Sequence, residues 1–375
     1  MLQERLGKFP VVALVGARQT GKTTLARSMK GVHYDLELPE ERVRLDIEWT
    51  RAIKSKGLVV LDEAQSDPEI FPRLRSAVDQ DRKRNGRFLI LGSVSPALMT
   101  SVAESLAGRL AICEISPFNR FELGKINPDV HWLKGGYPDG GILGGAKFPV
   151  WQRNYLDLLA QRDLPNWGLP AKPRDSLRLF RMLAVAHGQV HNASQIGKSL
   201  GISYHTVNSY LGYLQMAFLI RELPAYYGNL KKRLVKSPKL YWRDSGLLHS
   251  LLRVHSYDEL LVQPWVGHSW EGYVTEQILS YLTAKGVEHE ASYLRTNDGY
   301  ELDLIVQSRG KLIAFEIKLT SSPRPADMAR LEKTASLIDA DWSVLVSRTA
   351  RDTTGQRSAS LSPGALKKFL DRAFG

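Results

Sequence analysis

Gly16-Ala17-Arg18-Gln19-Thr20-Gly21-Lys22-Thr23 lies between two segments of different character. Before it comes VVALV at 11–15, a short, apolar and mostly β-branched run that is typical of a buried strand. After it comes a helical pattern from Thr24 to Met29. The stretch matches G-x-x-x-x-G-K-[ST] at every position, in the strand–turn–helix setting that this pattern requires. It therefore predicts a loop that binds phosphate groups.

The residue types in this loop suit a nucleoside triphosphate. Its glycines permit a tight turn and a close approach of the backbone, and the N–H groups of the loop and of the helix N-terminus would face the phosphates. Lys22 would place a positive charge on the β- and γ-phosphates, and the Thr23 hydroxyl would coordinate Mg²⁺. We expect ATP and Mg²⁺ as cofactors, bound by Gly16, Ala17, Arg18, Gln19, Thr20, Gly21, Lys22, Thr23 and Thr24.

A second apolar run ends in two carboxylates, in the segment Leu58-Val59-Val60-Leu61-Asp62-Glu63. This is the shape of a Walker B motif. Asp62, at the end of the strand, is expected to hold the Mg²⁺ shell, and Glu63 is expected to polarise the attacking water. The simpler alternative is a strand that ends in two solvated acids, and the complete phosphate-binding loop argues against it.

Two further residues are candidates for contact with the γ-phosphate. Ser93 follows the apolar run at 88–91 and would sense the γ-phosphate at the end of that strand. Arg109 follows Leu106-Ala107-Gly108 and would neutralise transition-state charge, either in its own chain or in a neighbouring subunit of a homo-oligomer. The alternative for Arg109 is an ordinary surface arginine.

The order of these segments predicts the fold class. Apolar strand patterns at 11–15, 32–36, 58–61 and 88–91 alternate with helical stretches, which favours a doubly wound parallel α/β sheet over residues 1–125. A Gly- and Pro-rich stretch at 135–149 predicts a linker or an active loop. Residues 126–255 read as helical with one β-wing, and strands alternate with helices again over 256–375.

Composition sets further limits. A chain of 375 residues favours two or three domains. Its net charge of +12 favours a polyanionic partner such as nucleic acid, although a merely basic globular protein is the open alternative. No apolar run is long enough for a membrane helix, no secretory signal pattern is visible, and Cys113 is the only cysteine. We therefore expect a cytoplasmic protein without a membrane partner.

These motifs resemble those of a known family, the prokaryotic AAA-type ATPases with a C-terminal domain of unknown function numbered 4143. The resemblance implies an AAA-like ATP-binding domain, a winged-helix segment and a nuclease-like C-terminal domain. In relatives a few dozen residues usually precede the first strand, whereas here residues 1–10 precede it. The matching blocks are GARQTGKTTLAR (16–27), LDEAQ (61–65), LGS (91–93), ESLAGR (104–109), ISPFNRFEL (115–123), GYELDLIV (299–306) and AFEIKLT (314–320).

The middle segment carries a helix–turn–helix pattern over 192–211, with the turn at Gly201 and Ser203 as the expected N-cap of the second helix. Residues 226–243 then contain six basic residues and no acid, interleaved with aromatic residues. Such a basic wing suits a nucleic-acid backbone, with DNA favoured. A protein–protein module is the alternative, because the expected recognition helix carries no Arg or Lys. The residues expected on its exposed face are Tyr204, His205, Asn208 and Ser209.

The C-terminal part contains a carboxylate–lysine pattern. Asp303 lies in one predicted strand, and Glu316 and Lys318 share one face of the next, with a turn signal at Ser308-Arg309-Gly310 between them. Asp303 and Glu316 could jointly bind Mg²⁺ or Mn²⁺, and Lys318 could position or deprotonate a water. The pattern resembles the PD-(D/E)xK core of a small α/β restriction-endonuclease-like domain. That resemblance implies a further metal-binding acid on the preceding helix, where Glu271 stands and Glu276 is a second candidate.

The sequence supports two functional hypotheses. In the first, the protein is an ATPase that acts on nucleic acid and cleaves it with a metal-dependent C-terminal site. In the second, it is a nucleotide-dependent switch that binds a protein or DNA partner, and its C-terminal domain cleaves nothing.

Overall fold

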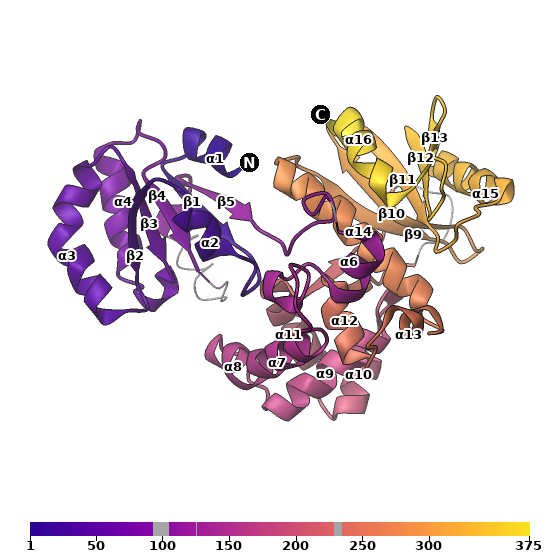
Figure 1. The fold of residues 1–375 in the computed structure, drawn as a ribbon, viewed down its shortest axis with the longest axis horizontal. Coiled ribbons are helices and arrows are strands. Elements are labelled where there is room, and N and C mark those ends of the chain that lie inside the picture. Colours follow the sequence, from indigo (N-terminus) through magenta and orange to yellow (C-terminus); the bar gives the residue numbers. More distant parts are fainter. Residues whose placement is uncertain (93–104, 125, 229–234) are drawn as a thin grey trace. The chain divides into compact units, whose positions relative to one another are not determined.

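The computed structural model describes residues 1–92, 105–124, 126–228 and 235–375. The chain forms two compact units. Unit 1 comprises Met1–Pro117 with the short segments Asn166–Leu169 and Met216–Phe218, and unit 2 comprises the remaining residues to Gly375 (Figure 1). Unit 1 thus ends before the predicted boundary at 125, and the predicted regions 126–255 and 256–375 lie together in unit 2.

A parallel five-stranded sheet forms the centre of unit 1. Its strand order is β2-β3-β4-β1-β5, and each neighbouring pair is parallel. Four strands lie where the apolar runs predict them, and β5 is an addition to that prediction. The strands are β1 (Val11–Val15), β2 (Gly31–Asp35), β3 (Leu58–Asp62), β4 (Phe88–Leu91) and β5 (Leu110–Glu114).

Both faces of this sheet are covered, as the continuous apolar strands require. Alternate residues of β1 point to opposite faces, so that Val11 and Ala13 join one core and Val12 joins the other. The first core includes α3 (Pro39–Lys54) and α4 (Ile70–Gln80), and the second includes α1 (Leu2–Lys8) and α2 (Lys22–Arg27). The predicted doubly wound α/β architecture of the N-terminal part is therefore confirmed, and it fits a P-loop NTPase.

The first part of unit 2 is mainly helical. It also contains a three-stranded sheet of order β6-β8-β7, in which β8 lies between two antiparallel neighbours. The strands are β6 (Gln189–Val190), β7 (Ile220–Leu223) and β8 (Lys239–Trp242). The helices are α6 (Pro128–Lys134), α7 (Val150–Leu158), α8 (Leu164–Asn166), α9 (Pro173–Val185), α10 (Ala193–Leu200), α11 (Tyr204–Met216), α12 (Ser245–Leu251) and α13 (Tyr257–Leu261).

The Gly- and Pro-rich stretch at 135–149 is not a linker, which corrects the prediction from composition. Tyr137 is only 1% exposed, and the N–H of Gly136 donates to the Asp244 carboxylate over 2.8 Å. A Cβ at Gly135 would collide with the same carboxylate. Gly135 thus permits close packing, because its absent side chain lets the backbone approach α12 and its N-cap.

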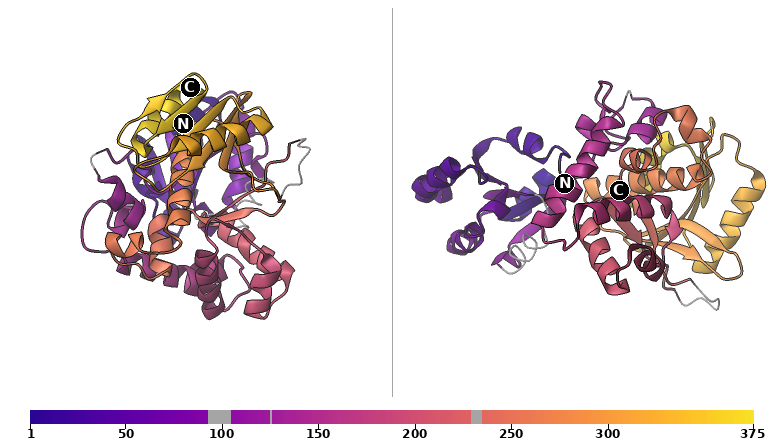
Figure 2. Two further views of the ribbon diagram at one scale, coloured as in Figure 1. Left: turned by 90° about the vertical axis from the view of Figure 1, so that its right-hand side faces the viewer. Right: turned by 90° about the horizontal axis from the view of Figure 1, so that it is seen from below.

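The second part of unit 2 is a six-stranded sheet of order β13-β14-β12-β11-β10-β9. Helices α14 (Val266–Lys285) and α16 (Pro363–Phe374) pack on one face of it, and α15 (Pro325–Ala335) packs on the other (Figure 1, Figure 2). The strands are β9 (Glu290–Arg295), β10 (Glu301–Ser308), β11 (Lys311–Ile317), β12 (Trp342–Val346), β13 (Thr353–Thr354) and β14 (Ser358–Leu361).

Strands β10 and β11 form the predicted antiparallel hairpin, with Ser308 opposite Lys311. Arg309 and Gly310 at its tip both have positive φ, of 50° and 74°. This conformation fits the tight turns that join twisted antiparallel strands. In the part of the chain that the structure describes, no helix is long and apolar enough to cross a membrane.

Candidate nucleotide site and carboxylate pocket

The loop at 16–23 joins the carboxyl end of β1 to the start of α2. Gly16 has a φ of 150°, and a Cβ there would collide with the carbonyl oxygen of Ile115, which follows the neighbouring strand β5. Gly21 has a φ of 94° at the N-cap of α2. The Thr20 hydroxyl donates to the Ala17 carbonyl over 2.9 Å and holds the turn. Both glycines thus occupy positions that a larger residue would strain.

Lys22 folds back onto this loop. Its ammonium donates to the carbonyl oxygens of Gly16 over 2.9 Å and Ala17 over 2.7 Å, and the residue is 8% exposed. Burial lowers the pKa of Lys22 to about 8, against the attraction of Glu63 and Asp62. The two carbonyl oxygens are neutral dipoles and do not neutralise the ammonium. A bound polyphosphate would supply the missing negative charge.

Thr23 and Asp62 come together from separate elements, α2 and β3. Burial raises the pKa of Asp62, and a hydrogen bond with the Thr23 side chain opposes that shift. A hydroxyl beside a carboxylate at the carboxyl edge of a parallel sheet is the oxygen donor set that Mg²⁺ prefers. The residues present therefore fit the expected ion, and Thr23 and Asp62 are the residues that would hold it.

Glu63 follows Asp62 in a left-handed backbone conformation, with a φ of 49°. Its carboxylate accepts a hydrogen bond from the Gln65 side chain, and its own N–H donates to Asp62 over 3.0 Å. The role predicted for Glu63, polarisation of the attacking water, stays a prediction. Ser93, the predicted γ-phosphate sensor, lies outside the described residues.

The prediction that Arg109 neutralises transition-state charge in its own chain is wrong. Its carbonyl oxygen accepts from the N–H of Val11, at the amino end of β1, whereas the phosphate loop begins at the carboxyl end. The strand spans about 3.3 Å per residue, so its full length separates Arg109 from the loop. The guanidinium binds Asp79 through two hydrogen bonds of 2.9 and 3.0 Å. Arg109 therefore does not serve the nucleotide of its own chain, and its action in a neighbouring subunit stays a prediction.

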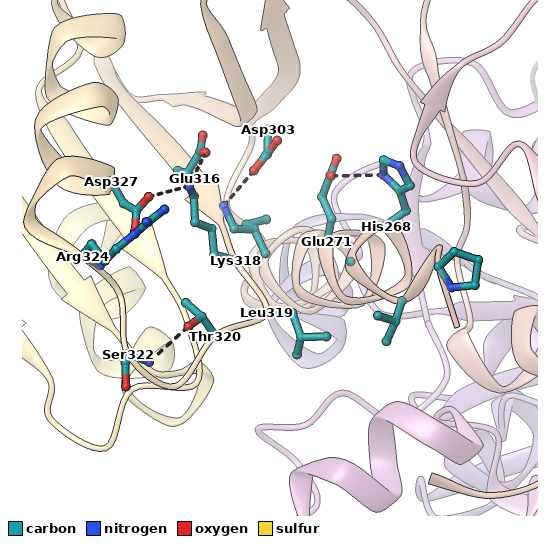
Figure 3. A pocket seen from close by; sticks show the side chains of 14 residues that line it. His268, Glu271, Asp303, Glu316, Lys318, Leu319, Thr320, Ser322, Arg324 and Asp327 are labelled. Atoms are coloured by element: carbon teal, nitrogen blue, oxygen red, sulfur yellow. Dashed lines mark hydrogen bonds and ion pairs between the residues drawn. The ribbon is translucent and has the colours of Figure 1, made fainter. Parts of the chain in front are cut away.

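The predicted carboxylates of the C-terminal part do meet in one pocket of about 790 Å³. Glu271 projects from α14, Asp303 from β10 and Glu316 from β11, and Lys318 follows β11 (Figure 3). Asp303 accepts the N–H of Ile317 over 2.8 Å, which fixes it against the neighbouring strand. Arg324, Asp327 and His268 also line this pocket.

The sequence did not indicate that a buried cation outside the pocket lining, Lys239, contacts two of these acids. Its ammonium lies 3.0 Å from Glu271, 3.1 Å from Glu301 and 3.7 Å from Asp303. Tyr241, two residues along β8, donates to the same Glu271 oxygen over 2.5 Å. The available signal was the alternation in Lys239-Leu240-Tyr241-Trp242, which places Lys239 and Tyr241 on one face of a strand.

Lys239 and Glu271 shift each other's titration. Burial alone would lower the pKa of Lys239, but attraction to Glu271, Asp303 and Glu301 outweighs it and raises that pKa. Burial alone would raise the pKa of Glu271, but Lys239 and hydrogen bonds from His268 and Tyr241 lower it to about 2. Burial and the neighbouring Glu271 and Glu316 raise the pKa of Asp303 well above its usual range. Lys239 and Glu271 thus form a buried ion pair beside the pocket.

Lys318, predicted to act on water, is held by a neighbouring acid. Its ammonium donates to Asp327 over 2.8 Å and lies 3.7 Å from Glu316 (Figure 3). Asp327 in turn accepts the N–H of Arg324 at the start of α15. The alternation that places Glu316 and Lys318 on one side of their strand is borne out by this contact, while the chemical role of Lys318 stays a prediction.

The metal predicted for this pocket does not fit the residues found there. Among the residues that the structure describes, no three His, Cys, Asp or Glu side chains are arranged to hold a metal ion. Two of the acids that a divalent ion would share, Glu271 and Asp303, instead lie 3.0 and 3.7 Å from the Lys239 ammonium. A second cation beside that ammonium would meet strong repulsion in a buried setting. Glu271, Asp303 and Glu316 are therefore not a ready metal site.

The predicted helix pair also forms. Ser203 caps α11, since its hydroxyl oxygen accepts the N–H of Thr206 over 3.1 Å. The stripe of Val207, Leu211 and Leu214 is buried, as the periodicity predicts. On the opposite side Tyr204, His205 and Ser209 are exposed, and Asn208 is half-buried.

The basic wing is smaller than the sequence suggested. Lys231, Lys232 and Arg233 lie outside the described residues, and Lys239 is buried among carboxylates. Arg243 binds Glu276 over 2.8 Å in the interior, and Glu276 also accepts from Arg221. Tyr241 and Trp242 belong to the core. Glu276, the second candidate for a metal-binding acid, is therefore satisfied by two arginines, and a one-dimensional count of charges could not reveal this pairing.

Fold and site together define a class: a P-loop NTPase-type α/β unit followed by a second unit with a carboxylate pocket. The family model described as "AAA domain" matches residues 8–124. "Domain of unknown function (DUF8612)" matches residues 127–258, and "Domain of unknown function (DUF4143)" matches residues 266–363.

Two mycobacterial relatives resemble most of the chain. Uncharacterized protein Rv2008c of Mycobacterium tuberculosis and Uncharacterized protein Mb2031c of Mycobacterium bovis are each 38% identical over 327 residues. The match covers 86% of this chain and 73% of each relative. The chain belongs to the family of AAA-type ATPases that carry a C-terminal DUF4143 domain. Membership supports an ATPase at the level of the family.

Among solved structures, Can2 from Sulfobacillus thermosulfidooxidans in complex with cyclic tetra-adenylate covers 98% of this chain and 99% of its own at 11% identity, with a TM-score of 0.25. Protein VC1899 from Vibrio cholerae covers 97% and 98% at 13% identity, with a TM-score of 0.22. Scores this low support no statement about the fold.

Proposed function

We propose that unit 1 binds and hydrolyses ATP with Mg²⁺. The observation that carries this proposal is the meeting of the Thr23 hydroxyl and the Asp62 carboxylate beside a buried, loop-bound Lys22. These three groups come from the phosphate loop and from β3, and together they offer a cation and an oxygen donor set at one edge of the sheet.

Each residue has a separate task in this proposal. The backbone N–H groups of the loop hold the phosphate oxygens, and the Lys22 ammonium exchanges its two carbonyl partners for the β- and γ-phosphates. Mg²⁺, when bound, neutralises charge on the phosphates, and Thr23 and Asp62 are the residues that would hold it. Glu63 would accept a hydrogen bond from the attacking water and so orient a lone pair of that water toward phosphorus.

Phosphate release and calorimetry test this assignment. Lys22→Ala is expected to abolish hydrolysis, because no other described side chain of the loop carries a positive charge into the same buried position. Glu63→Gln is expected to bind ATP with near-normal affinity and to hydrolyse it slowly, since it removes the base and keeps the fold. Lys54→Ala, at an exposed lysine of α3, is the matched control. Wild-type hydrolysis by Lys22→Ala would refute the assignment.

We also propose that the segment from α9 to β8 is a winged helix that binds nucleic acid, with DNA favoured. Three helices and a sheet of order β6-β8-β7 support the fold. The exposed polar side of α11, with His205 and Ser209, and the net charge of +12 support the partner.

Fluorescence anisotropy with labelled duplex DNA, repeated over a range of salt concentrations, tests this partner. We expect binding that weakens as salt rises, and a loss of affinity in Asn208→Ala and His205→Ala without a loss of folding. Lys285→Ala, at a lysine on the end of α14, is the matched control. Binding that is absent at low salt would favour the alternative, a nucleotide-dependent switch that recognises a protein.

For the C-terminal sheet we keep the restriction-endonuclease-like fold as a proposal. A mixed sheet that carries acids at Asp303 and Glu316, with α14 beside it, supports this relationship. Nuclease activity stays a prediction of the resemblance, and its test is the release of nucleotides from DNA and RNA in Mg²⁺ or Mn²⁺, with and without ATP.

A further inference from the structure

Three carboxylates and one aromatic ring lie around the Lys239 ammonium. Glu271, Glu301 and Asp303 lie within 3.7 Å, and the ring of Tyr293 lies 5.3 Å from the nitrogen. The residue is 2% exposed. A buried lysine keeps its charge only if nearby acids compensate the cost of removing it from water. Here three acids from α14 and β10 do so.

One oxygen of the Glu271 carboxylate already has two donors, because it accepts from both Lys239 and Tyr241. The other oxygen lies 3.8 Å from His268. A divalent ion coordinated by the first oxygen would have to displace these donors. It would also have to share Asp303 with the Lys239 ammonium, which lies 3.7 Å from that carboxylate.

We infer that Lys239 is the resident cation of Glu271 and Asp303, and that its ammonium takes the place of a divalent metal ion between these two acids. Since Lys239 comes from β8, the same contact fastens the three-stranded sheet to α14 and β10. This inference concerns unit 2 alone and does not depend on ATP hydrolysis by unit 1.

Mn²⁺ binding to the nucleotide-free, full-length protein, followed by the electron paramagnetic resonance signal of free Mn²⁺, tests the inference. We expect wild type and Asp303→Asn to bind the same amount of Mn²⁺, because Asp303 does not contribute to a metal site while Lys239 is present. Any Mn²⁺ held by unit 1 is common to both proteins and cancels. A loss of bound Mn²⁺ in Asp303→Asn would overturn the inference.

A second comparison uses Lys239→Met, which keeps most of the side-chain volume and removes the charge. We expect it to gain a Mn²⁺ site that the double variant Lys239→Met/Asp303→Asn lacks, while Lys239→Arg, which keeps the charge, gains none. A folded Lys239→Met protein that binds no additional Mn²⁺ would overturn the inference. If circular dichroism shows that Lys239→Met does not fold, the comparison of wild type with Asp303→Asn decides the question by itself.

Discussion

Lys22 and Lys239 are both buried lysines, but their partners differ in kind. Lys22 donates to two neutral carbonyl oxygens of its own loop, and burial lowers its pKa to about 8. Lys239 lies among three carboxylates, whose attraction outweighs burial and raises its pKa. The first lysine gains from an incoming anion, whereas the second already has its counter-charges. This difference is why we assign phosphate binding to one and charge compensation to the other.

The buried carboxyl group of Asp244 predicts how the stability of the protein depends on pH. It accepts the N–H groups of Gly136 over 2.8 Å and Leu247 over 2.9 Å, yet burial raises its pKa from 3.8 to about 6. The folded protein therefore binds this proton more tightly than the unfolded chain. The stabilisation by this proton is largest at low pH and is lost as pH rises from about 4 through about 6.

Chemical denaturation of wild type and Asp244→Asn over this range measures the effect. The free energy of unfolding of wild type, minus that of the variant, should fall as pH rises, because the carboxamide does not titrate. A difference that is constant or increases between pH 4 and 6 would contradict the assignment.

At the scale of elements, β5 decides where Arg109 lies. The strand runs parallel to β1, with Val11 opposite Leu110, so the residue before it falls at the amino edge of the sheet. Parallel strands place all their carboxyl ends together, and the nucleotide site lies at that edge. An arginine that begins a strand cannot reach a loop that follows the strand beside it.

Arg109→Gln tests this placement. We expect ATP affinity and turnover to stay near wild type at protein concentrations where the chain is monomeric, with little loss of stability, because solvent screens the partly exposed pair with Asp79. Asp79→Asn, which breaks the same pair and keeps the guanidinium, is the control. A large loss of turnover in the monomeric protein would restore a role within the same chain, and a loss confined to an oligomer would support action in trans.

At the scale of the whole molecule, the segment that begins at Phe118 belongs to unit 2. Asn119 is 4% exposed, and its side-chain amide donates to the Gln277 carbonyl over 2.9 Å and the Ser280 hydroxyl over 2.6 Å. The N–H of Arg120 donates to the Gln277 side chain over 2.7 Å. These bonds attach Asn119 and Arg120 to α14, the helix that also carries Glu271.

Asn119→Ala is therefore expected to destabilise unit 2 by about 1–3 kcal/mol, because it leaves buried polar groups on α14 without their partner. ATP affinity, measured by calorimetry, should not change. Asn85→Ala, which removes an exposed contact to Gly7 in unit 1, is the matched control. A loss of ATP binding in Asn119→Ala with no change in unfolding would show that this asparagine serves the nucleotide site.

Local patterns in the sequence were sufficient to predict part of the candidate site and some of the local structure. The glycine spacing, the apolar run before it and the paired acids at 62 and 63 indicated a nucleotide site, and Ser203 and the turn at 308–310 predicted a helix start and a hairpin that the structure confirms. Each of these signals involves residues within a few positions of one another, where backbone geometry and side-chain period leave few alternatives.

The sequence by itself thus determined the glycine-containing loop at 16–23, four of the five strands of the parallel sheet and the carboxylates of the second pocket. Only the tertiary structure decided which charges meet. It placed Lys239 among acids 32 or more residues away, paired Arg243 with Glu276 and packed the glycine-rich stretch against Asp244. The physical reason is that an ion pair depends on distance in space, whereas a sequence records only distance along the chain.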